Sequence, residues 1–293
     1  MCCALALLPS AMAGDELKGA LTLARAERLV EGLRSEGWVD LPDSEPAQSM
    51  TSPGRRIYRI PFERQVLQDR IGQPVPLLGV LIERACNDLS VRINGSLIYE
   101  TTTGGPTRFN ECGAPHLVPL SWTLLHPGTN ELQLEVSGLP STWVATERRA
   151  YGISEVHLGE HAALRDLHRQ ETGRRVDVPA VVSGGLMLLG LLMSSLLVFP
   201  PREPHLVHFS ALCILWAGVT AHGAWSLPVE LSLVREGLLV VLVAAAGWCY
   251  SRFVCLYADL SVPWLDRLAL MQLLAAPLML IVLGAENLLI AAK

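Results

Sequence analysis

The chain has 293 residues, of which 51% are hydrophobic, and it carries a formal net charge of −5 with a mean hydropathy of +0.36. A half-apolar composition at this length excludes a disordered chain and a single water-soluble domain. The slightly acidic balance gives no reason to expect a nucleic-acid partner.

The N-terminus has features of a secretory signal. Residues 1–13 form a short apolar run that ends in Ala11-Met12-Ala13, a small-x-small pattern that suits cleavage before Gly14. A positively charged start is missing, and the alternative is a frayed apolar N-terminus. We predict a signal peptide over residues 1–13 and export of the domain that follows.

Residues 14–36 form the first segment after the expected cleavage site. Leu17 to Leu33 contains good helix formers and apolar residues at helical spacing, which predicts a helix. The run ALTLARAERLV within it also suits an entry strand of a sheet, so both alternatives stand.

From residue 37 to residue 160 the pattern changes to short alternating segments separated by turn residues. Asn94-Gly95 between two alternating runs is a strong signal for a tight hairpin, and Pro127-Gly128 indicates a turn before another strand. Several short strands at regular spacing predict an all-β sandwich over residues 37–160. The expected strands are 56–62, 77–83, 89–93, 96–100, 116–122, 131–136 and 153–158.

The seven cysteines fall into three groups. Five lie in the expected signal peptide or in apolar segments near the C-terminus, which leaves Cys86 and Cys112 in the exported domain. Two cysteines in an exported domain suggest one disulfide, which the chain-entropy model expects to stabilise the fold by about 3–4 kcal/mol. The alternative is a pair of unpaired buried thiols.

The C-terminal part reads as a membrane domain. Residues 178–199 carry no charge and are long enough to cross a bilayer of about 30 Å as a helix. Further spans are expected near 206–225, 237–257 and 268–285. Residues 161–177 read as a juxtamembrane helix. Its His161 and His168 would share a face, but such a pair is more often solvated than a metal site.

The orientation of the first span rests on conflicting signals. Four arginines precede it, and by the positive-inside rule they would place the β domain in the cytoplasm: Arg165, Arg169, Arg174 and Arg175. The signal-like N-terminus and the cysteine pair favour export. We expect a multi-pass protein of the bacterial inner membrane with its N-terminal domain in the periplasm.

Catalytic motifs are missing from the sequence. It contains no GxxxxGK[ST], GxGxxG, GxSxG, HExxH or CxxC pattern. We therefore predict no catalytic, cofactor-binding or metal-binding residue in this chain, and the ligand-binding residues stay unassigned.

Five short motifs in a fixed order carry a family resemblance. They are Leu41-Pro42-Asp43, Arg56-Ile57-Tyr58-Arg59, Val91-Arg92-Ile93-Asn94-Gly95, Leu124 to Leu132, and Ile153 to Gly159. This order resembles the jelly-roll, galactose-binding-like sensor domains that precede a multi-helix membrane region in bacterial sensor histidine kinases and diguanylate cyclases, the seven-transmembrane receptors with diverse intracellular signalling modules. The resemblance covers residues 36 to 200 in motif and the remainder in hydropathy. It implies an extracytoplasmic sandwich followed by an α-helical membrane domain.

The resemblance also implies a function. We expect the signal-sensing input portion of a sensor histidine kinase in two-component signalling, without the catalytic module. Because four spans would return the chain to the outer side, either one span is wrongly assigned or the chain is the front part of a longer protein, and we expect the longer protein. The alternatives are the input portion of a diguanylate cyclase and a membrane-anchored carbohydrate-binding or assembly protein. The expected partners are the lipid bilayer and either a periplasmic ligand or a protein. A carbohydrate-like compound is one such ligand. For a kinase, a second copy of the chain is also expected.

Overall fold

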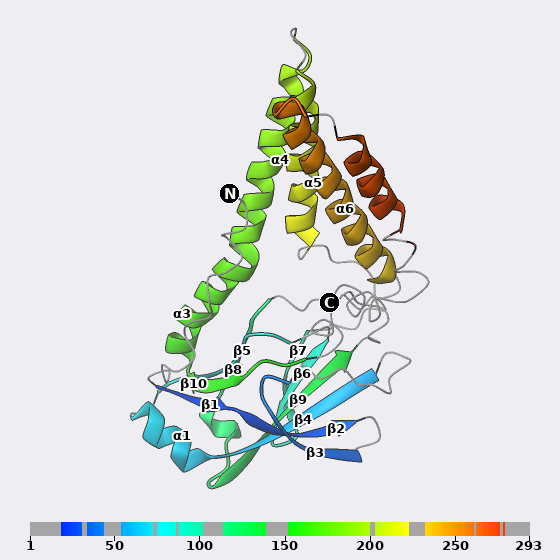
Figure 1. Ribbon diagram of the computed structural model, residues 1–293. Helices are drawn as coiled ribbons and strands as arrows, with labels where there is room; N and C mark the ends of the chain where they lie inside the picture. The colour runs from blue at the N-terminus through cyan, green and yellow to red at the C-terminus, as the bar shows by residue number, and fades with distance from the viewer. Residues whose placement is uncertain are drawn as a thin grey trace.

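The computed structural model describes residues 19–30, 34–43, 54–72, 75–85, 88–101, 114–138, 152–199, 203–222, 232–260, 262–275 and 278. These residues form a β-sandwich at one end of the molecule and a group of long helices at the other (Figure 1). One long helix leaves the sandwich and enters the helical group. The predicted signal peptide, Cys86 and Cys112 lie outside the described residues.

Two antiparallel sheets make the sandwich. The four-stranded sheet has the order β1-β10-β5-β8, and the six-stranded sheet has the order β3-β2-β4-β9-β6-β7. The strands are β1 (Ala20–Leu23), β2 (Arg25–Val30), β3 (Arg34–Asp40), β4 (Gly54–Glu63), β5 (Leu78–Ile82), β6 (Leu89–Ile93), β7 (Ser96–Glu100), β8 (His116–Leu120), β9 (Thr129–Gly138) and β10 (Val156–Glu160). Two short helices, α1 (Arg64–Ile71) and η1 (Trp122–Leu124), accompany them.

The core lies between the two sheets. Strand β4 alternates buried and exposed side chains along its length, as expected for a strand with one face on the core and one on water. Its Tyr58 and Ile60 belong to the same buried cluster as Val80 of β5 and Leu158 of β10, each at most 1% exposed. Strand β5 is buried along its whole length because it lies in the interior of its sheet under a helix.

The turns of the sandwich follow their local chemistry. Asn94 and Gly95 join β6 to β7 with φ values of 49° and 83°, the positive values that such a two-residue hairpin turn requires. Gly128, after Pro127, has a φ of 92° and precedes β9. Gly95 and Gly128 therefore occupy backbone conformations that a side chain would strain.

Of the two alternatives for residues 14–36, a helix or an entry strand, the structure has strands in the described residues 19–30, where β1 and β2 lie, and the helix is wrong there. Strand β1 pairs with β10, and β2 pairs with both β3 and β4. Ala26 and Leu29 are buried by this pairing, at 0% and 3% exposure. Contacts with distant strands outweigh the helix propensity of the segment. Strand β3 and helix α1 were not expected from the sequence.

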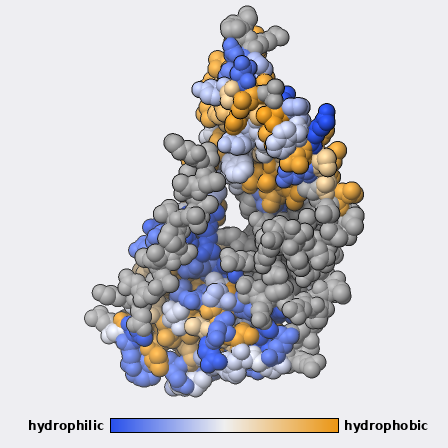
Figure 2. All heavy atoms as spheres, in the orientation of Figure 1, coloured by the Kyte–Doolittle hydropathy of each residue, from blue (hydrophilic) through white to orange (hydrophobic). Residues whose placement is uncertain are grey.

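The helical part begins directly after β10. Helix α3 (His161–Thr172) continues through the π-helical turn η3 (Gly173–Asp177) into α4 (Val178–Leu196), and α5 (Pro204–Ala221) and α6 (Ser232–Tyr257) follow. Within the part of the chain that the structure describes, three helical segments are long and apolar enough to cross a membrane: His161–Leu196, Pro204–Ala221 and Gly237–Tyr257. Figure 2 shows apolar side chains gathered over this end of the molecule and mixed polar surface over the sandwich.

The fourth expected span, near 268–285, is described in part. Residues 263–275 are helical, and most of the remainder lies outside the described residues.

Candidate functional site

The site of interest is the place where the sandwich joins the long helix. Strand β10 ends at Glu160 and α3 begins at His161, so no linker separates them. The helix then runs without a break from His161 to Leu196, 36 residues in all. Two independent domains are usually joined by a flexible Gly-, Ser- or Pro-rich segment. The direct connection instead ties the last strand of the sandwich to the first apolar helix.

Helix α3 is docked on the four-stranded sheet by apolar contact. Leu164 is fully buried and packs with Leu81 of β5 and Ala20 of β1. A Cβ added to Gly79 would lie 3.3 Å from the Cα of His161, which is closer than most real contacts of this kind. Glycine at this position lets the start of the helix approach the sheet backbone.

A second contact fixes α3 against strand β8. The Nε2 atom of His168 lies 3.1 Å from the carbonyl oxygen of Pro115, within hydrogen-bond distance. The neighbouring His116 is buried at 9% exposure, and its Nδ1 lies 3.3 Å from the hydroxyl of Tyr99. Burial, and to a smaller extent the nearby His168, lowers the pKa of His116 to about 4. Two histidines of different elements thus meet where the helix docks.

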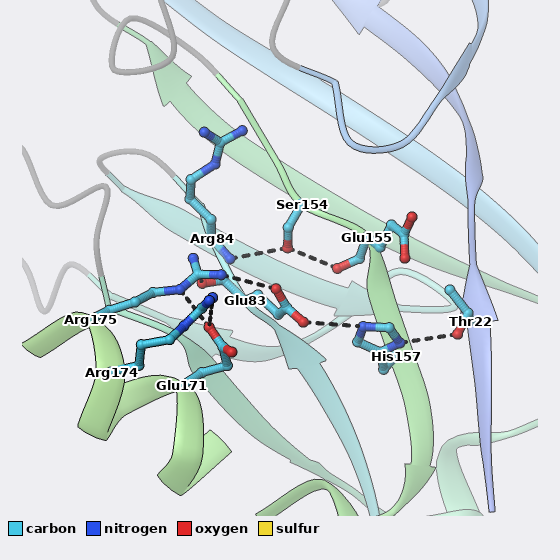
Figure 3. Close-up of polar contacts among 9 residues, drawn as sticks. All are labelled: Thr22, Glu83, Arg84, Ser154, Glu155, His157, Glu171, Arg174 and Arg175. Atoms are coloured by element: carbon cyan, nitrogen blue, oxygen red, sulfur yellow. Dashed lines mark hydrogen bonds and ion pairs between the residues drawn. The ribbon is translucent and has the colours of Figure 1, made fainter. Parts of the chain in front are cut away.

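Charged groups hold the helix near its π-helical turn (Figure 3). Arg175 donates to the Glu83 carboxylate at 3.0 Å and to the Glu83 carbonyl oxygen at 3.1 Å. Its Nε also donates to the Glu171 carboxylate at 2.6 Å, and Arg174 donates to the same oxygen at 2.9 Å. We call Glu83, His157, Glu171, Arg174 and Arg175 the junction cluster.

The junction cluster continues into the sheet through His157 of β10. Its Nε2 lies 3.6 Å from Glu83 Oε1, and its Nδ1 lies 3.1 Å from the hydroxyl of Thr22 in β1. The neighbouring His157, followed by the charge of Arg175, lowers the pKa of Glu83 below its usual value. Three strands and the long helix are therefore joined by one polar network.

The burial of the junction cluster determines how much its hydrogen bonds stabilise the contact between the helix and the sheet. The side chains of Glu171, Arg175 and Glu83 are 12%, 25% and 27% exposed. Hydrogen bonds between charged groups contribute about 1.5–3 kcal/mol each when partly buried, and much less when fully exposed. Loss of Arg175 would leave two carboxylates without their main partner. The cluster is thus a position-specific contact between the helix and the sheet.

The other end of the long helix is docked equally closely. Ser183 of α4 donates to the carbonyl oxygen of Ala217 in α5 at 2.8 Å, and Ser210 of α5 donates to the carbonyl oxygen of Gly190 at 2.8 Å. A Cβ on Gly190 would lie 2.6 Å from Cγ1 of Ile214. Small residues allow this close helix packing, and the serines add bonds across it.

The junction cluster joins the sheet and the long helix through shared charged side chains. The carboxylates of Glu83 and Glu171 are occupied by arginine, and the described residues contain no group of three or more metal-ligating side chains. The junction cluster can transmit a displacement of the sheet to the helix because both are bonded to the same side chains.

The structure gives the arginines before the first apolar span different surroundings. Arg174 and Arg175 are paired with acidic groups of the junction cluster, whereas Arg165 and Arg169 are exposed on α3. Half of the positive charge that argued for a cytoplasmic β domain is therefore bound to carboxylates.

Sequence reasoning did not find the junction cluster. Glu83 and Arg175 are 92 positions apart, and His157, which falls in the expected strand 153–158, is 8% exposed. The one local signal was Glu171 followed by arginines three and four positions later, a helical spacing for ion pairs. The motif residues Asn94, Gly95, Pro127 and Gly128 lie in turns away from this cluster.

Comparison with known proteins yields distant structural likeness. No family model and no curated protein matches the chain. Among solved structures, a GH2 β-galacturonidase from Eisenbergiella tayi bound to glycerol is 16% identical, with a TM-score of 0.34. The match covers 50% of this chain and 25% of the galacturonidase chain. An FMN-binding β-glucuronidase from Facaelibacterium prausnitzii L2-6 is 19% identical with a TM-score of 0.34, covering 49% and 23%. A β-glucuronidase from Ruminococcus gnavus in complex with D-glucuronic acid is 14% identical with a TM-score of 0.34, covering 50% and 30%.

The chain thus spans less than a third of the length of these glycosidases.

Proposed function

We propose that this chain is the signal-sensing input portion of a membrane-bound sensor histidine kinase. The sandwich would bind a ligand or a protein partner on the periplasmic side of the bacterial inner membrane. The membrane helices would carry the resulting change to a kinase module on the other side. The observation that supports this most directly is the unbroken helix from His161 to Leu196.

A sensor needs a physical connection between its ligand-binding domain and its output. The long helix is bonded to the sandwich by Leu164, His168 and Arg175, and to α5 by Ser183 and Gly190. A domain held only as an anchor would need no such contacts. Ligand binding that favours one arrangement of the sheet would thereby favour one arrangement of the helix, which is a population shift.

The kinase proposal is tested on membranes of the source cells. An antibody raised against the sandwich should detect a protein clearly larger than 31.9 kDa. That protein should incorporate phosphate from ATP in an acid-labile form, as phosphohistidine does. A protein of about 31.9 kDa that takes up no phosphate would contradict the proposal and favour a membrane-anchored binding protein. A larger protein that forms cyclic di-GMP instead would favour the cyclase.

The proposed orientation is tested separately. Alkaline phosphatase, which is active only in the periplasm, is fused after Glu160 and, in a second fusion, between α4 and α5. We expect activity for the first fusion and none for the second. The reverse pattern would place the sandwich in the cytoplasm.

A further inference from the structure

The long helix contains one irregular turn, and its position carries a further inference. At η3 the amide of Val178 bonds to the carbonyl oxygen of Gly173, five positions back instead of four. Such π-turns hold one extra residue, are rare inside α-helices and occur frequently at functional sites. This one separates the part of the helix docked on the sandwich from the part docked on α5.

The extra residue aligns these two docked faces. Leu164 faces the sandwich and Ser183 faces α5, nineteen positions later. At about 100° per residue, an uninterrupted α-helix would place them about 100° apart around its axis. The extra residue removes about 100° and brings them to the same side. Figure 1 agrees, since the sandwich and α5 both lie to the right of the long helix.

The junction cluster holds the π-turn in place. Arg174 and Arg175 lie inside the turn, and both donate to Glu171 one turn earlier. Arg175 also reaches Glu83 of the sheet. The turn is thus bonded both to the preceding α-helix and to the sandwich.

We propose that η3 is a register switch, in which release of Arg175 from Glu83 and Glu171 lets the π-turn close to α-helix. The helix would then turn by about 100° between its two docked faces. Because Gly190 and Ser183 hold α4 to α5, the helical group would turn as one body against the sandwich. Helices pack with axes about 8–10 Å apart, so α5 would move by an amount on the order of 10 Å.

This inference rests on the proposed sensor function, for which it names the motion that carries the signal. It does not require a particular output. If the helix turns but the protein takes up no phosphate, the kinase proposal is contradicted and the switch stands. If the protein takes up phosphate but the helix does not turn, the switch is contradicted and the kinase proposal stands.

The experiment measures the distance between the sandwich and the helical group in the full chain in lipid nanodiscs. Spin labels are attached to a non-natural ketone side chain at Ser96 in the hairpin and Val234 in α6, so that the seven native cysteines stay in place. Both positions are exposed. A second pair, at Val181 and Val243, reports distances inside the helical group, where both side chains are exposed as well.

The trigger is the double variant Glu83→Gln and Glu171→Gln, which keeps size and removes charge. Losing a charge-assisted bond shifts an equilibrium by about tenfold. We therefore expect a second population of the first label pair, displaced on the order of 10 Å, and an unchanged second pair. The matched control is Asp166→Asn, an exposed acid of the same helix. It should leave both distances unchanged.

Removal of Val176 supplies the decisive comparison. Without its extra residue the turn becomes regular α-helix with both faces still docked, so the double variant should no longer move the labels. Two results would overturn the switch: a double variant that keeps the original distances, or one that moves equally with and without Val176. Near-unchanged circular dichroism of each variant shows that the helices are retained.

Discussion

Arg175, in the π-turn of the long helix, and Glu83, at the end of β5, are joined by two hydrogen bonds across 92 positions of sequence. One reaches the carboxylate and the other the carbonyl oxygen of the same residue. The bond to the backbone fixes where the guanidinium lies, and the bond to the carboxylate adds charge. This pair connects the residue that follows β5 to the π-turn that precedes the apolar helix α4.

Replacement of Arg175 should loosen the helix from the sheet. Arg175→Ala leaves Glu83 and Glu171 short of a cation, and we expect it to lower the free energy of local opening of α3 by about 1–3 kcal/mol. Arg175→Lys should restore part of this, because lysine lacks the planar fork that reaches two acceptors. Hydrogen exchange of the α3 amides measures the effect. Arg169→Ala, at an exposed position of α3, is the control and should leave exchange unchanged.

Acid should weaken the same contact through Glu83. Its pKa is lowered in the folded protein by His157 and then Arg175, from a usual value of 4.5. A carboxylate whose pKa is lower in the folded protein stabilises the fold fully at pH values above its pKa in the unfolded chain. This stabilisation is lost as the pH falls through its pKa in the folded protein. Exchange protection of α3 should therefore be constant from pH 7 to about 5 and decrease below about 4.5. Glu83→Gln should start lower and lack this step, and an equally large step in that variant would show that another group titrates.

His116 should make the sandwich sensitive to milder acid. Burial, followed by His168, lowers its pKa from 6.5 to about 4. The unfolded chain then binds a proton between these values that the folded chain does not, so stability falls as the pH drops from 6.5 to 4. The contribution is at most about 3 kcal/mol. In His116→Asn the urea concentration at the unfolding midpoint should change less between pH 6.5 and 4. His126→Asn, at an exposed position, should keep the pH dependence of the original protein.

Two glycines of α4 offer a matched test of the helix packing. A Cβ at Gly190 would meet Ile214 at 2.6 Å, whereas a Cβ at Gly184 meets nothing within 4 Å. Gly190→Ala should destabilise the contact between α4 and α5 by about 1–3 kcal/mol, as overpacking does. Gly184→Ala should be neutral or slightly stabilising. Unfolding by sodium dodecyl sulfate, followed by circular dichroism, compares them. Equal midpoints would mean that α5 does not pack on Gly190.

Asn130 should be the most sensitive polar residue of the sandwich. It is 1% exposed, and its amide accepts from Asn94 at 2.8 Å and from the His126 amide at 2.7 Å. It also donates to the carbonyl oxygens of His126 and Gly128, both at 3.0 Å. Asn130→Ala removes all four bonds and should cost about 2–4 kcal/mol in urea unfolding. Gln133→Ala, on the same strand and half-buried, should cost far less.

The sequence predicts those parts of the fold that depend on local chemistry. The hairpin of β6 and β7 needs positive φ at Asn94 and Gly95, and those two residue types reveal it without any knowledge of the remainder. The motif around Pro127 and Asn130 is also local, because Asn130 bonds to groups two and four positions away. An apolar run of spanning length, such as α4, is likewise recognised from its own residues.

The parts that sequence reasoning missed depend on distant partners. The segment around β1 has good helix formers, but Thr22 hydrogen-bonds to His157, 135 positions later. No periodicity in the segment itself reveals such a partner. The junction cluster also depends on distant partners, since Glu83 lies in the predicted sandwich and Arg175 in the predicted juxtamembrane helix. The π-turn likewise follows from the fit of two docked faces.

The strand order also fixes when the sandwich can be completed. Strand β10 lies between β1 and β5, and within the described residues it is the strand that pairs with β1. The four-stranded sheet therefore stays in two pieces until the last residues of the domain have been made. Because α3 starts at His161, immediately afterwards, we expect closure of the sheet and entry of the first apolar helix into the bilayer to be neighbouring events in biosynthesis. A chain arrested before residue 156 would present an N-terminal strand with no place in the sheet.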